Sequence, residues 1–196
     1  MGNGRSHNEL QHFQGSGWAN YCPRCAGVLE ERYLETEQRH RKVCSACGFI
    51  FYINPKVVAG AIPRQGDLIW LVRRSIEPSP GHWTFPGGCV DLGERVPDAA
   101  IRETYEETRL NIQLDNLLNI YSYETAPVVL VVYNATVVGG TAGVTPESQE
   151  VRTFRLDEIP WSDLAFPSTH DALADYVQYR KGLRSRPRDV GNPLPD

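Results

Sequence analysis

Long apolar runs are missing from this sequence, and neither sign of charge dominates it. No stretch reaches the ~18 consecutive apolar residues that a membrane-spanning helix needs, so we expect no membrane partner. The 24 acidic and 20 basic residues give a formal net charge of −4, which argues against a protein that coats nucleic acid through a generally basic surface. The N-terminus lacks the apolar segment of a secretory signal peptide, which predicts a cytoplasmic protein.

The sequence also lacks the composition that is typical of a disordered protein. Hydrophobic residues make up 41% of the 196 positions, so the chain has enough apolar surface to bury a core. That surface is unevenly distributed, and residues 18–52 hold too little of it to fold on a hydrophobic core alone. We expect a disordered N-terminus over 1–17, a small module over 18–52, a larger domain over 53–182 and a mobile tail over 183–196.

Cysteine is scarce, and four of the five cysteines fall in two pairs. Each pair encloses two residues, and 18 residues separate Cys25 from Cys44. An odd count with this pairing argues against a secreted disulfide framework and favours a metal in a reducing compartment. A redox pair or two disulfides are the alternatives. The ligands that we predict for a closed, structural zinc site are Cys22, Cys25, Cys44 and Cys47.

Glycines follow both cysteine turns. Gly27 and Gly48 stand where the chain leaves each turn, and we expect backbone with positive φ there. The fifth cysteine, Cys89, has no accompanying His/Asn arrangement, so we interpret it as a small residue and not as a nucleophile.

Strand and helix patterns begin after Asn54-Pro55. Pro97 and Asp98 are typical of the first turn of a helix, which the pattern places over 97–108. The other elements that we expect are strands over 57–62 and 67–72 with a hairpin turn at 64–66, a loop over 75–95, strands over 128–133 and 151–154, and a helix over 169–180.

The helix expected over 97–108 carries a group of carboxylates. Glu103 precedes Glu106 and Glu107 by three and four residues, so all three lie near one helix face. Oxygen ligands at this density suit Mg²⁺ or Mn²⁺, because a cation relieves their mutual repulsion. Three glutamates alone more often form a solvated acidic face than a metal site. The surrounding sequence pattern therefore has to distinguish between these two interpretations.

That pattern resembles the Nudix box, G-x5-E-x7-R-E-U-x-E-E-x-G-U, in which U is a bulky aliphatic residue. The matching positions are Gly88, Glu94, Arg102, Glu103, Glu106, Glu107 and Leu110. Thr104 replaces an aliphatic residue, and Arg109 replaces the glycine that normally ends the helix. A non-glycine residue in that left-handed conformation costs roughly 1 kcal/mol. Residues 81–88 also look like the loop that enters the box in this family.

The resemblance implies an α/β fold, an α/β/α sandwich with a mixed sheet. It implies hydrolysis of a nucleoside diphosphate linked to another group. Glu103, Glu106 and Glu107 would hold Mg²⁺ or Mn²⁺, with a backbone carbonyl near Gly88, while Glu94 and Arg102 would order the loop and the helix. We count Arg102 among the candidate catalytic residues.

The general base stays open at this point. In some relatives the catalytic glutamate comes from a loop before a late strand, which corresponds here to residues 139–150. Glu147 and Glu150 are the candidates, and Glu150 is slightly favoured because it lies just before the strand expected at Val151. Glu103 is the alternative base.

The zinc ribbon in front of the box narrows the range of possible substrates. NADH pyrophosphatases share this order, and some remove NAD caps from RNA, but their S-Q-P-W-P-F-P-type motif is absent after Leu110. Residues 51–56, 78–83, 156–160 and 164–166 look more like a shorter group related to plastid FAD pyrophosphatases. FAD or ADP-ribose is therefore favoured, with release of AMP. A non-catalytic nucleic-acid-binding regulator on the same scaffold is the alternative from another class.

Candidate substrate contacts are Trp83, Phe85 and Arg73. Aromatic rings offer stacking surfaces for adenine or flavin, although most aromatics here are more typical of a core. Apart from capped RNA, we expect no nucleic-acid partner. Relatives often dimerise, so a homodimer is a further expectation of the resemblance.

Overall fold

The computed structural model describes residues 19–124 and 126–183. These form two compact units, of which the first extends to Pro55 and includes Glu124–Pro127, and the second comprises Lys56–Tyr123 and the chain from Val128 onward. The expected disordered start over 1–17 lies outside the described residues, as does the tail apart from Leu183.

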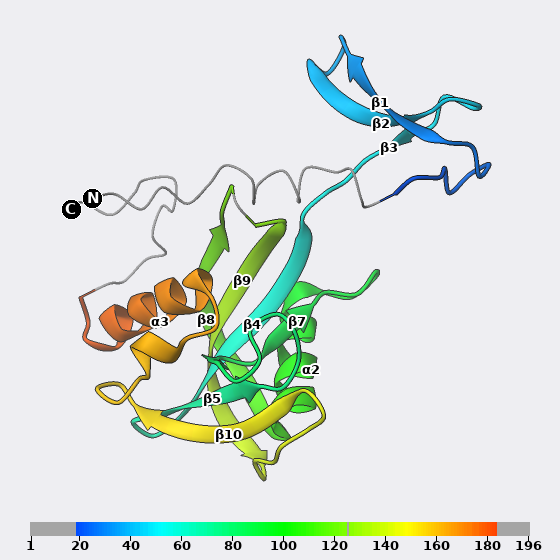
Figure 1. Cartoon of the computed structure of the whole chain (residues 1–196). Helices are drawn as coiled ribbons and strands as arrows, with labels where there is room; N and C mark the ends of the chain where they lie inside the picture. Colours follow the sequence, from blue (N-terminus) through cyan, green and yellow to red (C-terminus); the bar gives the residue numbers. More distant parts are fainter. Residues whose placement is uncertain (1–18, 125, 184–196) are drawn as a thin grey trace. The chain divides into compact units, whose positions relative to one another are not determined.

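The first unit is a small antiparallel sheet of three strands, in the order β1 (Leu29–Leu34), β2 (Arg39–Cys44) and β3 (Ile50–Phe51) (Figure 1). Its buried cluster consists of Cys22, Leu29 and Cys44, with Ala19, Phe49 and Phe51 packed against it, and Val43 is also buried. Two of the three residues of this cluster are cysteines, so the sulfur atoms lie where a larger domain would have its hydrophobic core.

The second unit is built on a mixed sheet of seven strands, with the path order β10-β5-β4-β9-β8. The short strands β6 and β7 pair with β5 and β4. Only the pair β4–β9 is parallel among the described ladders. The strand bounds are β4 Lys56–Gln65, β5 Leu68–Arg74, β6 Trp83–Thr84, β7 Gly87–Cys89, β8 Leu110–Ser122, β9 Val128–Gly140 and β10 Ser148–Arg155.

The expected hairpin forms, although its two strands pair over only a short stretch. Only Arg64–Ile69 and Gln65–Leu68 pair across the turn, and Gly66 adopts φ 63° in it. The earlier part of β4 pairs instead with β7 and β9. The expectation of an unbroken loop over 75–95 is wrong, because β6 and β7 lie within it.

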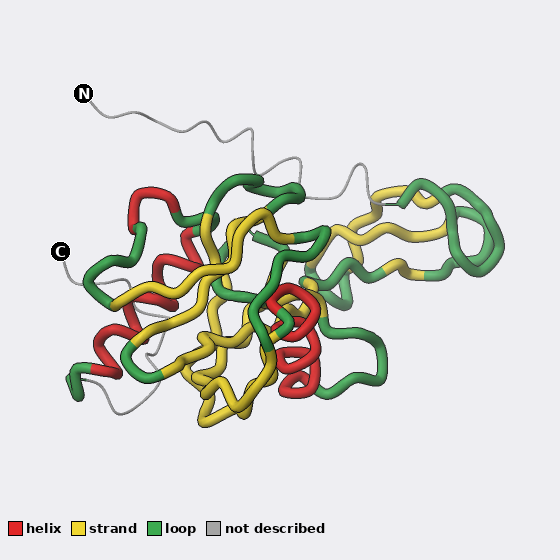
Figure 2. Tube along the Cα trace, turned by 90° about the horizontal axis from the view of Figure 1, so that it is seen from below, coloured by secondary structure: helices red, strands yellow, loops and turns green. Residues whose placement is uncertain are grey.

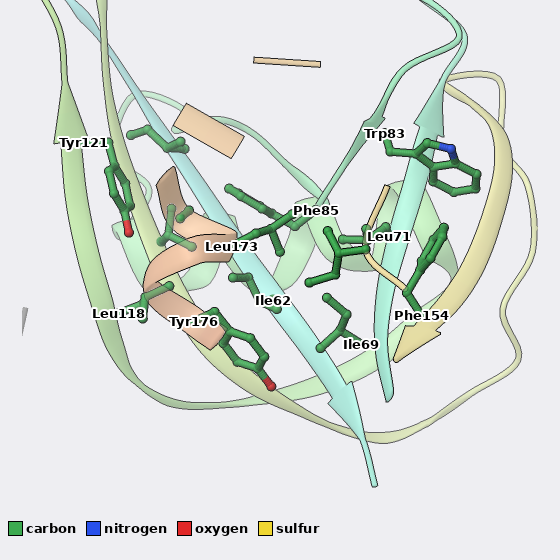
Figure 3. Close-up of a cluster of buried hydrophobic side chains, with 14 residues drawn as sticks. Ile62, Ile69, Leu71, Trp83, Phe85, Leu118, Tyr121, Phe154, Leu173 and Tyr176 are labelled. Atoms are coloured by element: carbon green, nitrogen blue, oxygen red, sulfur yellow. The ribbon is translucent and has the colours of Figure 1, made fainter. Parts of the chain in front are cut away.

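Two helices cover the sheet, α2 (Val96–Thr108) and α3 (Pro167–Arg180), with a 3₁₀ turn at Trp161–Asp163 before α3. Side chains alternate between the faces of a strand. Ala59 of β4 packs with Ala99 and Ala100 of α2, whereas Ile62 packs with residues of α3 in the larger core cluster (Figure 3). The helices therefore lie on opposite faces (Figure 2), which confirms the predicted α/β/α sandwich.

Both edge strands of the sheet are irregular. β8 shifts register against β9 at three places, between Asn111 and Ile112, Leu114 and Asn116, and Leu117 and Asn119. β10 shifts once against β5, between Ser148 and Glu150. Such bulges twist a strand locally and interrupt its ladder of hydrogen bonds.

None of the helices within residues 19–124 and 126–183 combines the length and apolar character that crossing a membrane demands.

Helix α2 ends on a residue in the left-handed conformation. Arg109 has φ 64° and ψ 12°, and its N–H donates to the carbonyl oxygen of Tyr105 at 2.8 Å. The Arg109 guanidinium lies 5.7 Å from the centre of the Tyr105 ring. The backbone thus adopts the geometry that favours glycine, while the arginine side chain gains a contact with the helix.

We predict that Arg109→Gly stabilises the protein by up to about 1 kcal/mol, because glycine carries no Cβ penalty in this conformation. In a domain of this size the midpoint of thermal unfolding should rise by roughly 2–4 °C. Arg109→Ala is the matched control, since it removes the same side chain but keeps the Cβ. An equal gain in both variants would contradict a backbone origin.

Candidate functional site

Glycines let the segment around Gly87 and Gly88 lie directly against its neighbours. A Cβ on Gly87 would lie 2.6 Å from Cα of Gly60 in β4, and a Cβ on Gly60 would lie 2.8 Å from Cε2 of Phe85. A Cβ on Gly88 would overlap the carboxylate of Glu103. The loop backbone therefore packs against both β4 and the acidic face of α2, with no space for side chains between them.

The helix that carries the glutamates is locally well specified. Pro97 lies in its first turn, and Asp98 adds negative charge near the N-terminus. Thr104, the residue that departs from the aliphatic pattern, is fully buried, and its hydroxyl donates to the carbonyl of Ala100 at 2.7 Å. This hydrogen bond explains how a threonine is accommodated in the apolar interface.

Arg102 connects the loop to the helix. Its Nε and Nη2 donate to the two carboxylate oxygens of Glu94 at 2.8 and 2.9 Å, and Nη2 also donates to the Cys89 carbonyl at 3.1 Å. Nη1 donates to Glu103 at 2.8 Å and to Glu106 at 3.2 Å. A bidentate guanidinium–carboxylate pair fixes geometry as well as charge.

These contacts place Arg102 in a positioning role. The hydrogen bonds from Arg102, followed by the one from the Asp91 backbone, lower the pKa of Glu94 to about 2. Glu94 therefore stays ionised, so the link between loop and helix persists at neutral pH. The ordering of loop and helix that the resemblance implies for Glu94 and Arg102 corresponds to these contacts.

The three glutamates differ in exposure. The side chain of Glu103 is 12% exposed and that of Glu106 is 54% exposed, while Glu107 is buried and accepts a hydrogen bond from the Gly87 backbone at 3.3 Å. Burial raises the pKa of Glu107 to about 8 and also raises the pKa of Glu103. Carboxylates in so dry a setting need a cation to remain charged.

The oxygen set fits a hard divalent cation, but the glutamates are spread out around Arg102. Within the described part of the chain, the four paired cysteines are the only group of three or more potential metal ligands whose ligand atoms are gathered closely enough to hold an ion. Arg102 already bridges Glu103 and Glu106, whereas Glu107 turns toward Gly87. Glu103, Glu106 and Glu107 are the residues that would hold Mg²⁺ or Mn²⁺, since carboxylate oxygens are the donors these ions prefer.

Glu147 lies in the field of these carboxylates. Its charge contributes to raising the pKa of both Glu103 and Glu107. The Glu147 carbonyl accepts a hydrogen bond from the Ser75 backbone at 3.0 Å, and the hydroxyl of Ser148 donates to the Glu107 carbonyl at 3.1 Å. These bonds attach the end of the β9–β10 loop to the residue that follows β5 and to the C-terminal turn of α2.

Glu150 is placed differently from the sequence expectation. Strand β10 begins at Ser148, so Glu150 lies inside the strand and not in the loop before it. Its carboxylate lies 3.6 Å from Nη1 of Arg152. The bulge between Ser148 and Glu150 changes the direction of side chains there, which the sequence pattern does not reveal.

The structure buries two of the three proposed substrate contacts. Trp83 and Phe85 are 3% and 4% exposed and belong to the large core cluster (Figure 3), so neither presents a stacking surface. Arg73 donates from Nε to the Gly81 carbonyl at 2.6 Å and so holds the loop. The expectation that these three residues contact substrate finds no geometric support.

Arg74 is a residue that the sequence interpretation missed. Its positive charge reaches Glu107 and works against the rise in the pKa of that carboxyl. Its guanidinium donates to the Pro78 carbonyl at 2.8 Å and lies 5.2 Å from the centre of the Phe166 ring. Adjacent strand residues point to opposite faces, so register decides which of Arg73 and Arg74 faces the site.

The four cysteines form a site of tetrahedral size. All four sulfur atoms lie within 4.8 Å of one another, with Cys22–Cys47 at 3.8 Å and Cys25–Cys44 at 3.5 Å. Zn–S bonds of about 2.3 Å in a tetrahedron place sulfur atoms about 3.8 Å apart. The residues present therefore fit a closed zinc site.

The two cysteine turns differ in backbone detail. Gly48 has φ 71° as expected, but in the first turn the residue with positive φ is Ala26, at 59°. Gly27 is needed for a different reason, since a Cβ there would lie 2.9 Å from the Ala46 Cβ and 3.0 Å from the Cys44 sulfur. The expectation of positive φ at Gly27 is therefore wrong.

The second cysteine turn also favours the thiolate form of Cys44. The pKa of the Cys44 thiol is lowered to about 7 by hydrogen bonds with the backbone. The bond with the Cys47 backbone has the larger effect, and the bond with the Ala46 backbone has a smaller one. The thiolate is the form that binds a metal.

Two family profiles match the chain. One is described as NUDIX domain and matches residues 54–176, and a zinc-ribbon profile described as Nudix N-terminal matches residues 20–53. An ADP-ribose pyrophosphatase from Methanocaldococcus jannaschii is 31% identical over 135 residues, which are 67% of this chain and 78% of that protein. An NAD-capped RNA hydrolase NudC from Stutzerimonas stutzeri is 25% identical over 143 residues, which are 71% of this chain but only 49% of that protein.

Solved structures show the same similarity. The crystal structure of a NUDIX hydrolase from Nitrosomonas europaea has a TM-score of 0.80 and 34% sequence identity, and the match covers 84% of this chain and 93% of that chain.

We predict that Cys44→Ser lowers the zinc content and unfolds the module of residues 20–53, because the metal replaces a hydrophobic core there. Structural zinc contributes roughly 10–16 kcal/mol to folding in small zinc domains. Elemental analysis and protease cleavage of the module report the two effects. Cys89→Ser is the control and should retain zinc. Zinc-free protein after purification under reducing conditions would contradict the site.

Proposed function

Because the chain belongs to the Nudix hydrolase family, we propose that it hydrolyses the pyrophosphate bond of a nucleoside diphosphate derivative. The favoured substrates are ADP-ribose and FAD, and the shared product is AMP. The reaction depends on Mg²⁺ or Mn²⁺, while zinc is structural. The observation that carries this proposal is the link of Arg102 to Glu94, Glu103 and Glu106 beside Gly88.

The proposed chemistry follows from charge. Divalent cations, when bound, neutralise the pyrophosphate and act as Lewis acids on it. Glu103, Glu106 and Glu107 supply oxygen ligands, and Arg102 keeps their helix aligned with the loop at Gly88. The buried setting of Glu107 strengthens electrostatic interactions because little water screens them.

Arg74 is proposed to contact a phosphate of the substrate. Its guanidinium is held by carbonyl oxygens and by the Phe166 ring, and none of these contacts neutralises its charge. A guanidinium in the field of metal-binding carboxylates matches the two oxygens of a phosphate. This assignment replaces the earlier expectation for Arg73.

The choice among substrates rests on the relatives. The relative named ADP-ribose pyrophosphatase supports ADP-ribose, and FAD is supported by the sequence stretches that resemble the plastid group. Relatives named NAD-capped RNA hydrolase support NADH or capped RNA as the second candidate, although this chain spans only about half of their length. A purely nucleic-acid-binding role is less favoured, since every acidic residue of the box is present.

We propose the cytoplasm as the location, as the cysteine pattern indicates, and a homodimer as the assembly, as the resemblance implies. None of the five cysteines within the described residues forms a disulfide, which supports a reducing compartment.

We propose Glu147 as the general base, ahead of Glu150 and Glu103. Its backbone is held by Ser75, and the neighbouring Ser148 anchors the loop to α2, so its carboxylate is kept in the field of Glu103 and Glu107. A base must lie within reach of the attacking water, and a loop fixed next to the metal ligands provides that position.

The test of substrate is a panel of ADP-ribose, FAD, NADH, NAD-capped RNA and coenzyme A, each with Mg²⁺ or Mn²⁺. Chromatography quantifies AMP from the first three substrates, NMN from the capped RNA and 3′,5′-ADP from coenzyme A. We expect ADP-ribose or FAD to give the highest kcat/KM. Salt-sensitive RNA binding with no turnover of any substrate would reject an enzymatic role.

We predict that Glu147→Gln lowers kcat by ~10²-fold or more with a small change in KM, because the amide cannot accept the proton from water. Glu150→Gln is the matched control and should retain near wild-type kcat. The reverse result would make Glu150 the base, and normal turnover in both variants would assign the role to Glu103.

A further inference from the structure

A tight turn over residues 145–148 carries Glu147 near its tip. Thr145 and Ser148 pair as an isolated antiparallel bridge, and the Ser148 N–H donates to the Thr145 carbonyl at 3.1 Å. Pro146 occupies the second position of this four-residue turn, where its fixed φ is favoured, and Glu147 occupies the third. Glu147 is exposed, whereas Ser148 is 4% exposed. The turn therefore has an accessible tip and a buried end.

Two hydroxyl groups connect the backbone of Glu147 to that of Glu107 through a chain of hydrogen bonds. The Glu147 N–H donates to Oγ1 of Thr145 at 3.3 Å, and this Oγ1 lies 3.2 Å from Oγ of Ser148. Oγ of Ser148 donates to the Glu107 carbonyl at 3.1 Å. Because Ser148 gives its one hydroxyl proton to Glu107, Thr145 is the donor in the contact between the two side chains. The chain thus joins the turn to the helix that carries the glutamates.

The Ser148 hydroxyl has no spare bonding capacity in this arrangement. A hydroxyl offers one donor and two acceptor sites. In addition to its bonds with the Glu107 carbonyl and the Thr145 hydroxyl, Oγ of Ser148 accepts the Thr145 N–H at 2.9 Å. Loss of this hydroxyl would remove a partner from two backbone groups and one side chain, and a buried polar group without a partner is costly.

The same loop completes the C-terminal end of α2. The last carbonyl groups of a helix have no partners within the helix. The Glu107 carbonyl accepts from Ser148, and the Thr108 carbonyl accepts from the Gly143 N–H at 3.0 Å. The β9–β10 loop therefore supplies donors that this helix end needs, and the turn at Glu147 keeps a fixed place relative to α2.

We propose that Thr145 and Ser148 are positioning residues, whose hydroxyl groups hold Glu147 beside the carboxylates of α2. This inference rests on the proposed function, in which Glu147 takes a proton from the attacking water. Misplacement of a reacting group by about 1 Å lowers a rate by up to roughly 10²-fold, so the bridge of two hydroxyls determines how well Glu147 works as a base.

The steady-state kinetics of hydroxyl-deleting variants test this role, in the full zinc-loaded chain with Mg²⁺ and the best substrate of the panel. Ser148→Ala and Thr145→Val should each lower kcat about tenfold and change KM by less than about twofold, because the base is displaced while substrate binding is retained. Thr145→Ser keeps the hydroxyl and should retain kcat within about twofold. Ser122→Ala, at an exposed serine in β8, is the control and should match the wild type.

A double-mutant cycle separates positioning from a general loss of structure. In a Glu147→Gln chain no base remains to be positioned, so the addition of Ser148→Ala should lower kcat by less than about twofold more. Full additivity of the two losses would overturn the proposal. Wild-type kcat in Ser148→Ala, wild-type kcat in Glu147→Gln, or equal losses in Thr145→Val and Thr145→Ser would overturn it as well.

Amide hydrogen exchange, followed by NMR, tests the attachment of the turn without any substrate. In Ser148→Ala the Thr145 amide should exchange at least about tenfold faster than in the wild type, because it loses its acceptor. Unchanged exchange at this amide would show that the hydroxyl does not hold the turn, and would overturn the proposal. Faster exchange in a protein that hydrolyses no substrate of the panel would instead reject the proposed function.

Discussion

The close approach of one loop to a strand and a helix is the constraint on which the rest of the catalytic domain depends. Gly60 and Gly87 let two backbones touch, and Gly88 places the loop against the carboxylate of Glu103. At this separation the Arg102 side chain can reach both sides. The carboxylates are then crowded and partly dry, which is the electrostatic condition for binding divalent cations.

Features that depend on residue spacing were predictable from the sequence. The two cysteine pairs gave the zinc ligands, which the structure gathers within 4.8 Å, and the box pattern gave the family, which the profile matches confirm. The helices over 97–108 and 169–180 are found within one or two residues of their predicted bounds. Spacing along a helix or a tight turn fixes geometry locally, so no knowledge of distant segments was needed.

Features that depend on register and packing were not predictable. Glu150 lies inside β10 because the strand begins at Ser148, and Arg73 holds a loop while the charge of its neighbour Arg74 acts on the pKa of Glu107. Trp83 looked like a stacking surface, yet it packs against Phe154 in the core. A shift of one residue exchanges the faces of a strand, and the sequence alone does not set that register.

The bulges in β8 and β10 have a consequence for how molecules meet one another. A long, regular edge strand offers a row of unpaired N–H and C=O groups to which another chain can add. Here the edge β8 is 13 residues long but breaks register three times, and β10 breaks it once. Both borders of the sheet are thus poor templates for strand addition, which protects the folded protein from edge-to-edge aggregation at high concentration.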